Sequence, residues 1–167
     1  MSILDIPVLS RIRRNHGLEH ATLTVLAGRF PYRRLAGISF PGGFLVLGEV
    51  PTADLREAVI VALSRLNNGE RHLAVHPTCG TNYAVSGVVA GLLAWLGLSG
   101  AKTRRDRLER LPLVMTLVTL AFIATQPLGP LVQKRITTSG DPQGLAVADV
   151  SPLPFGRLTL HRVTTQG

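Results

Sequence analysis

Two histidines four residues apart, His16 and His20, are the residues of this chain best placed to do chemistry. Residues at that spacing share one face of a helix, so both imidazoles can point at one spot. Glu19 lies beside the same face. Two neutral imidazoles suit a divalent transition metal, and a nearby carboxylate suits a general base or a further ligand.

A second cluster of metal-ligand residue types, His76 and Cys79, begins sixty residues after the first. Cys79 lies just before an expected helix start, where the helix dipole favours the thiolate. That thiolate suits a metal ligand, or a nucleophile partnered by His76. We therefore expect a divalent metal, zinc by donor type, held by His16, His20, His76 and Cys79, with Glu19 as the catalytic residue.

Turn and cap signals divide residues 1–82 into the elements of a small α+β domain. A helix from Ser10 through Ala27, with Gly28 as its stop, would carry the first cluster. A short strand, Leu73–Val75, would deliver His76 to the end of an element. The other elements expected here are strands Ala36–Phe40 and Phe44–Val50, joined by Pro41-Gly42-Gly43, and a helix that begins at Thr52 and ends at Asn67.

Residues 83–132 are expected to form a two-helix transmembrane or re-entrant hairpin. They contain the uncharged stretches Tyr83–Leu98 and Leu111–Val132, and a spanning helix needs about 20 apolar residues. A pair of buried helices in a soluble core is the alternative, but a domain this small has little protein with which to surround them. The lipid bilayer is thus the expected partner of a multi-pass protein. Gly87 and Gly91 give a small-residue face for close packing, possible between copies of the chain.

Residues 133–167 form a polar C-terminal segment with β-like runs at Leu145–Val150 and Arg157–Val163. Such a segment can be a hairpin that returns to the first domain, or a loosely ordered tail. Both alternatives stay open at the level of sequence.

The net charge of +8 fits a nucleic-acid binder or a protein beside anionic lipid. The apolar stretches favour lipid, and with aromatic residues at only 5% we expect no nucleic-acid partner. Arg11, Arg13 and Arg14 are interpreted as a solvated or lipid-facing patch. Basic residues at 101–110 favour a cytosolic loop, whereas the lack of an export signal favours a cytosolic N-terminal domain. The sequence leaves the topology open.

The paired clusters resemble a group of uncharacterised bacterial membrane proteins that carry His-Gly-x-Glu-His-Lys and His-Pro-x-Cys-Gly-Thr motifs and are described as predicted metal-dependent enzymes. The likeness covers roughly residues 15 to 100. This chain departs from the group at Ala21, where the group has lysine, and at Asn82, where it often has serine. The resemblance implies a bacterial inner-membrane location and a single site, without naming a substrate. That implied site comprises His16, Glu19, His20, His76 and Cys79.

Three functions fit these residues. A metal-dependent hydrolase would hold the metal with His16, His20 and either His76 or Cys79, leave one position for water, and use Glu19 as general base. A structural or sensory site would fill every position with protein ligands. A metal-free enzyme would use Cys79 and His76. The order His-x-x-Glu-His is that of inverted zinc peptidases. Those enzymes also need a distant glutamate ligand and a large chamber, for which this chain has no obvious equivalent.

Overall fold

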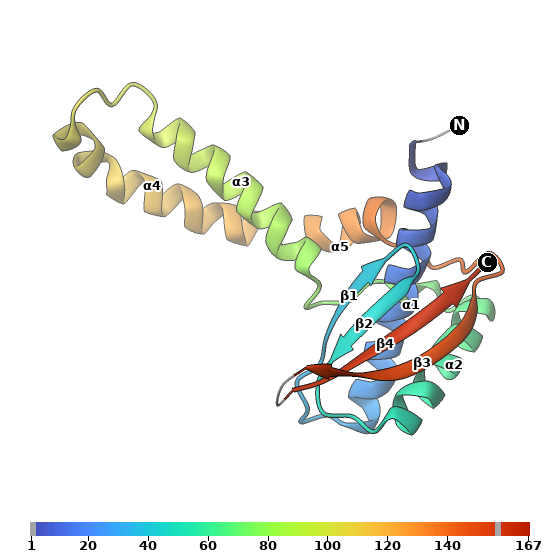
Figure 1. Cartoon of the computed structure of the whole chain (residues 1–167). Helices are drawn as coiled ribbons and strands as arrows, with labels where there is room; N and C mark the ends of the chain where they lie inside the picture. The colour runs from blue at the N-terminus through green and yellow to red at the C-terminus, as the bar shows by residue number, and fades with distance from the viewer. Residues whose placement is uncertain (1–2, 156–157) are drawn as a thin grey trace. The chain divides into compact units, whose positions relative to one another are not determined.

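The computed structural model describes residues 3–155 and 158–167 of the chain. The chain divides into two units (Figure 1). The first unit comprises Met1–His76 and Lys134–Gly167, and the second comprises Pro77–Gln133. The segment after residue 133 therefore belongs with the N-terminal elements.

The first unit is built on helix α1 (Pro7–Arg29), which follows a short 3₁₀ turn, η1 (Ile3–Asp5). The helix begins three residues before the expected Ser10, because proline fits the first helical position, where its missing N–H has no partner to lose. The backbone N–H of Ser10 instead donates to Ile6 O at 2.8 Å. The expected helix therefore exists, and both histidines of the first cluster lie near its middle.

Four antiparallel strands form one sheet in the order β1-β2-β4-β3. Strands β1 (Ala36–Phe40) and β2 (Gly43–Leu47) pair so that Phe40 faces Gly43, which leaves a two-residue turn and confirms the expected hairpin. Only glycine fits at position 43, because its φ is +146° and a Cβ there would lie 1.9 Å from Val163 O.

The C-terminal segment completes this sheet with β3 (Ala146–Phe155) and β4 (Leu158–Gln166). Strand β4 pairs with β2, with Val46 opposite His161. Of the two alternatives for this segment, the structure has the hairpin that returns to the first domain. The expected run Arg157–Val163 is β4 from Leu158 onward, and Arg157 lies outside the described residues.

Helices α1 and α2 (Thr52–Asn67) cover one face of the sheet (Figure 1). Alternate residues of β2, Phe44 and Val46, point into the space between helices and sheet, as the period of two requires. Burial of these side chains supplies most of the folding free energy of such a unit. The core residues that are fully buried include Leu18, Leu26, Phe44, Val46, Leu55, Val59 and Val163.

The prediction of a strand at Leu73–Val75 is wrong. The chain there forms a 3₁₀ helix, η2 (Arg71–Ala74), in which the N–H of Leu73 donates to Glu70 O at 3.1 Å. A run of three apolar residues does not distinguish a strand from a helical turn. Leu73 and Ala74 are buried, so η2 holds the chain in place two residues before His76, as the expected strand would have done.

The three arginines near the start of α1 are not a solvated patch. Arg11 donates to Thr165 O at 3.0 Å, and Arg13 donates to Thr138 O at 3.2 Å. Arg14 likewise donates to backbone carbonyls, at Pro142 and Gln143. Guanidinium groups therefore bind the returning C-terminal segment to α1 through its main chain.

The second unit consists of helices α3 (Gly80–Leu98), α4 (Arg104–Ala124) and α5 (Leu128–Val132), and the π-helical turn η3 (Gln133–Thr137) begins at its last residue. Helices α3 and α4 run side by side (Figure 1). A Cβ on Gly97 would lie 3.0 Å from Val114 Cγ2, so glycine allows this close packing. A Cβ added to Gly87 or Gly91 would have no atom within 4 Å, so these two glycines are not required for the α3–α4 contact.

Among the described residues, α3 is the one helix long and apolar enough to cross a membrane by itself. Helix α4 passes the same test only together with Leu128–Thr137, across a bend of 53°. Pro127, Gly129 and Pro130 lie at this bend and account for it. The expected pair of spans is therefore not confirmed; one candidate span is present, and a broken second one.

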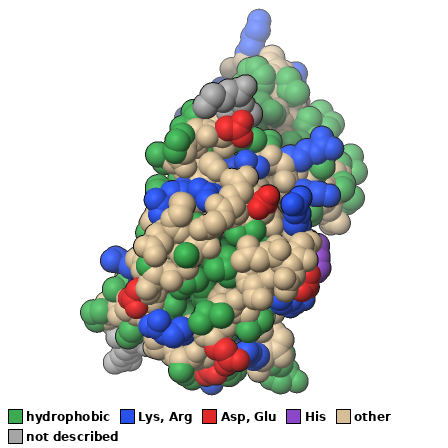
Figure 2. Space-filling view, turned by 90° about the vertical axis from the view of Figure 1, so that its right-hand side faces the viewer, with side chains coloured by type: hydrophobic (Ala, Val, Ile, Leu, Met, Phe, Trp, Pro, Cys, Tyr) green, Lys and Arg blue, Asp and Glu red, His purple; other side chains and the backbone are tan. Residues whose placement is uncertain are grey.

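Charged side chains on the surface of the first unit form scattered pairs. On the face drawn in Figure 2, basic and acidic side chains are interspersed with apolar and polar atoms. Arg29 and Glu57 lie 2.7 Å apart, and Arg56 and Asp149 lie 3.4 Å apart. Exposed pairs of this kind contribute little to stability, because water screens them, so burial and backbone hydrogen bonds determine the fold.

Replacing Gly17 by alanine should destabilise the first unit. A Cβ there would lie 2.0 Å from Ser139 O, a backbone atom that cannot move away alone. We expect Gly17→Ala to lower the free energy of unfolding by about 3 kcal/mol, the upper end for overpacking. Urea denaturation followed by circular dichroism measures this.

Gly28→Ala is the matched control, because Gly28 lies on the same helix with nothing within 4 Å of its added Cβ. This variant should gain about 0.5–1 kcal/mol from helix propensity. Equal effects of the two substitutions would contradict the docking of Ser139 against α1.

Candidate metal centre

The imidazole rings of His16, His20 and His76 lie next to one another in the first unit. The ring centroids of His16 and His20 are 4.3 Å apart, as their spacing on α1 predicts, and those of His20 and His76 are 5.6 Å apart. His76 follows η2, whose position against α1 brings it to His20. The structure thus brings together the three expected histidines from both sequence clusters.

Backbone carbonyls fix the orientation of the two α1 histidines. The Nδ1 atom of His20 lies 2.8 Å from Ala74 O, and that of His16 lies 3.0 Å from Thr137 O. A carbonyl only accepts, so each Nδ1 carries the proton and the lone pair of the neutral ring lies on Nε2. Metal-binding histidines in proteins use this arrangement, in which the second ring nitrogen donates to a carbonyl or carboxylate.

Glu19 is nearly inaccessible, with 3% of its surface exposed. Its carboxylate accepts a hydrogen bond from Ser39 Oγ on β1, and it lies so close to Gly37 that a Cβ there would be 2.3 Å from Oε1. Burial raises the pKa of Glu19, while the hydrogen bond from Ser39 and the electrostatic interaction with His16 partly oppose that rise. A raised pKa is what a carboxylate needs to act as a base near neutral pH.

Asn15 anchors α1 beside this cluster. Its side chain is fully buried; Nδ2 donates to Phe40 O at 2.9 Å and to Pro41 O at 3.1 Å. Its Oδ1 accepts from Thr165 Oγ1 at 2.7 Å. One amide thus joins α1 to the β1–β2 turn and to β4, immediately before His16.

The pKa of His76 is lowered, chiefly by burial and then by the electrostatic interaction with His20. A lowered pKa keeps the imidazole neutral at physiological pH, the form that binds metals. His76 therefore has the protonation state that a ligand requires.

Cys79 is the N-cap of α3, in line with its expected place just before a helix start. Its Sγ accepts from the backbone N–H of Thr81 at 3.4 Å. Cys79 follows His76 by three residues, so the chain limits the separation of their Cα atoms to about 11 Å. Cys79 belongs to the second unit, whereas His16, His20 and His76 belong to the first.

Other residues of the site were not visible in the sequence. The carbonyls of Ala74 and Thr137 leave no side-chain signal, because any residue has a carbonyl. Ser39 and Gly37 stand in a strand, where small residues have many explanations. The glycine is the one signal that could have been used, because glycine inside a strand marks a close approach.

The remaining two histidines, His72 and His161, lie outside the three-histidine cluster. His161 is buried in β4 with Nε2 3.0 Å from Thr52 Oγ1, in line with a structural role. His72 is exposed on η2 and lines a separate pocket. Neither is part of the three-histidine cluster.

Comparison with known proteins gives a family for this chain and no assigned activity. An uncharacterised protein of Picosynechococcus sp. (strain ATCC 27264 / PCC 7002 / PR-6) is 38% identical over 151 residues, which are 83% of this chain and 71% of the relative. No solved structure matches. Residues 11–150, which include the whole three-histidine cluster, match a family described as a domain of unknown function, DUF6391. The chain therefore belongs to the DUF6391 family.

Proposed function

We propose that this chain is a membrane-bound metalloprotein whose first unit holds a divalent metal, with zinc as the best-fitting ion. The supporting observation is that His16 and His20 each have Nδ1 on a backbone carbonyl and their rings 4.3 Å apart. In each ring Nε2 is then the nitrogen that would ligate an ion. A thiolate from Cys79 would complete a nitrogen and sulfur donor set, which zinc accepts, and His76 lies beside His20 as a further donor. With three ligands bound, the fourth position would stay open for water.

Glu19 gives this metal site its proposed chemistry, which is hydrolysis. A bound divalent metal acts as a Lewis acid and lowers the pKa of water. Glu19 is one residue from His20, buried, and held by Ser39, so its carboxylate is positioned without water around it. Its raised pKa suits proton acceptance from water at neutral pH.

A closed structural or sensory site is the second candidate. Four donor residues, two on α1 and two at the junction of η2 and α3, are enough to fill every position of a tetrahedral ion. Such a site would stabilise the fold and leave no position for substrate. The two candidates differ in the role of Glu19.

The second unit supports the proposed membrane location. Helix α3 has 19 residues, about 28 Å of helix, which is close to the hydrocarbon thickness of a bilayer. Large apolar side chains of α3 and α4 are exposed, among them Val88, Leu92, Trp95, Met115 and Ile123. Apolar surface on this scale needs lipid or another protein to cover it. A second copy packed through Gly87 and Gly91 remains part of the proposal.

Metal content of the purified protein tests the site. Wild type should bind one equivalent of zinc. His16→Ala and Cys79→Ser should each reduce the affinity for zinc. The reduction should exceed the 10–100-fold that is typical when a hydrogen-bond partner of a metal ligand is lost. Mass spectrometry of the metals, after equilibration with a zinc buffer, gives the stoichiometry.

His72→Ala is the control for the metal measurement, because His72 is an exposed histidine outside the cluster. It should keep the full equivalent. Equal zinc in wild type and in both ligand variants would exclude these residues as ligands.

Glu19→Gln separates the enzyme from the structural site. An amide of the same shape can still accept from Ser39 but cannot take a proton from water. If Glu19 is the base, the variant keeps one zinc and the thermal midpoint of wild type, as the hydrolase proposal expects. Zinc affinity reduced 10–100-fold, with a lower midpoint, would instead identify Glu19 as a group that holds the metal or orients a histidine.

Membrane association depends on α3 under this proposal. Wild type should stay with membranes during carbonate extraction, whereas Leu92→Arg should release a large part of it, since a charge at mid-helix costs about 2.5–3.5 kcal/mol. Ile60→Arg is the matched control, because Ile60 on α2 is exposed to 56% and Leu92 to 55%. Recovery of wild type as a soluble monomer without detergent would refute the membrane location.

A further inference from the structure

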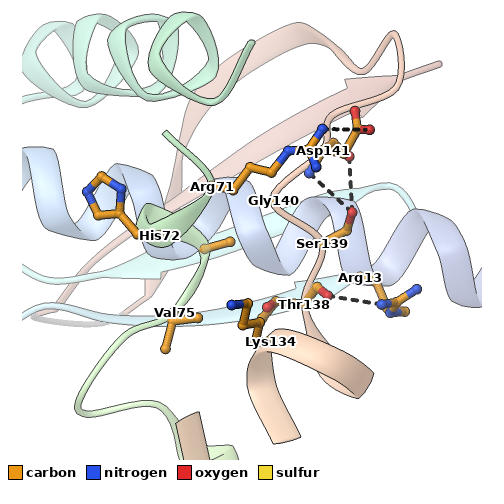
Figure 3. Close-up of a pocket in the computed structure, with 10 residues that line it drawn as sticks. Arg13, Arg71, His72, Val75, Lys134, Thr138, Ser139, Gly140 and Asp141 are labelled. Carbon is orange, nitrogen blue, oxygen red and sulfur yellow. Dashed lines mark hydrogen bonds and ion pairs between the residues drawn. The ribbon is translucent and has the colours of Figure 1, made fainter. Parts of the chain in front are cut away.

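A pocket of about 780 Å³ opens on the first unit (Figure 3). Its walls come from the start of α1, from η2 and Val75, and from the segment 134–141. A volume of this size is that of a small-molecule site, well above what a single water or ion needs. None of the histidines 16, 20 and 76 lines it.

Three cationic side chains, Arg13, Arg71 and Lys134, line this pocket, against one carboxylate, Asp141. Arg71 and Asp141 form an ion pair at 3.7 Å, too long for a hydrogen bond, so the N–H donors of Arg71 remain for a ligand. On the face shown in Figure 2, by comparison, basic groups are interspersed with acidic ones. The pocket thus has an excess of positive charge at a concave surface, which attracts anions.

Hydrogen bonds and close contacts build the walls of this pocket. Arg13 donates to Arg135 O at 3.3 Å and to Thr138 O at 3.2 Å, which fixes a guanidinium against the segment 134–141. Ser139 Oγ donates to Asp141 O at 3.1 Å. A Cβ on Gly140 would lie 2.8 Å from Arg71 O, so glycine lets this segment lie directly against η2.

The two segments that wall the pocket also hold the two α1 histidines. Ala74 lines the pocket and its carbonyl orients His20; Thr138 lines the pocket and follows Thr137, whose carbonyl orients His16. A molecule in this pocket would therefore lie next to the backbone that positions the metal ligands.

We propose that this pocket binds the phosphate group of an organic phosphate, either a lipid headgroup or a free phosphorylated molecule. Arginine recognises phosphate by paired N–H donors, and lysine adds a point charge. Ala74 and Val75 supply an apolar wall for the organic part. Phosphate binding is inferred from the residues that line the pocket. A role of the pocket in selecting the substrate of the metal site depends on the proposed function.

Acetylation of the chain's two lysines tests the pocket with a built-in control. Lys134 lines the pocket, and Lys102 lies in the α3–α4 connection. In a maltoside detergent, which has no phosphate, glycerol 3-phosphate should slow acetylation of Lys134 at least tenfold and leave Lys102 unchanged. In Arg71→Gln, an exposed position, half-protection should need about tenfold more ligand.

Nanodiscs distinguish the two sources of phosphate. Protection of Lys134 by phosphatidic acid in the disc, without soluble ligand, would identify a lipid headgroup; protection by glycerol 3-phosphate alone would identify a free phosphate. Either result supports the pocket. The phosphate site would be overturned if Lys134 were acetylated at the same rate with and without glycerol 3-phosphate and phosphatidic acid. Equal protection of Lys134 and Lys102 would also overturn it.

Zinc content of the same samples keeps this inference apart from the proposed function. Protection of Lys134 in a protein that binds no zinc supports the pocket and refutes the metal assignment. Zinc binding without protection refutes the pocket and supports the metal site.

Discussion

The structure depends on hydrogen-bond partners for the polar side chains that α1 carries into the protein interior. Asn15, Glu19 and His20 have at most 3% of their surface exposed. Leaving such groups without a partner costs several kcal/mol in total, since each loses its water. Their partners come from several elements: the β1–β2 turn and β4 for Asn15, Ser39 of β1 for Glu19, and Ala74 of η2 for His20. Helix α1 can satisfy all of them in one register only, so the contacts that fix the fold also position the residues of the proposed metal site.

Return of the chain after the second unit adds a further constraint on that register. Residue 139 crosses α1 at Gly17, where no side chain fits, and its N–H donates to Arg13 O at 2.8 Å. Arginines 11, 13 and 14 then bind the main chain of the returning segment at several points. This segment supplies the carbonyl that orients His16, completes the sheet through β3 and β4, and walls the cationic pocket. Metal ligation and phosphate recognition, as proposed, would share one framework.

Local signals predicted well what depends on neighbours in sequence. The spacing of His16 and His20 placed their rings together, and Pro41-Gly42 made the expected turn. What the sequence did not indicate depends on distant partners. Arg11, Arg13 and Arg14 look like a solvated run until the returning segment provides carbonyls. The run Leu73–Val75 is too short to separate a strand from a 3₁₀ turn. Carbonyl groups that orient the histidines belong to residues of any type, so no pattern marks them.

X-ray absorption spectroscopy on the zinc-loaded full chain tests the central claim most directly, because it reports ligand type and distance at the ion itself. This account predicts at least two nitrogen ligands at about 2.0–2.1 Å, with the outer-ring scattering of imidazole, and one sulfur at about 2.3 Å. Loss of the sulfur contribution in Cys79→Ser would assign it to that residue. A shell of oxygen atoms alone, without imidazole scattering, would contradict a metal centre built on His16 and His20.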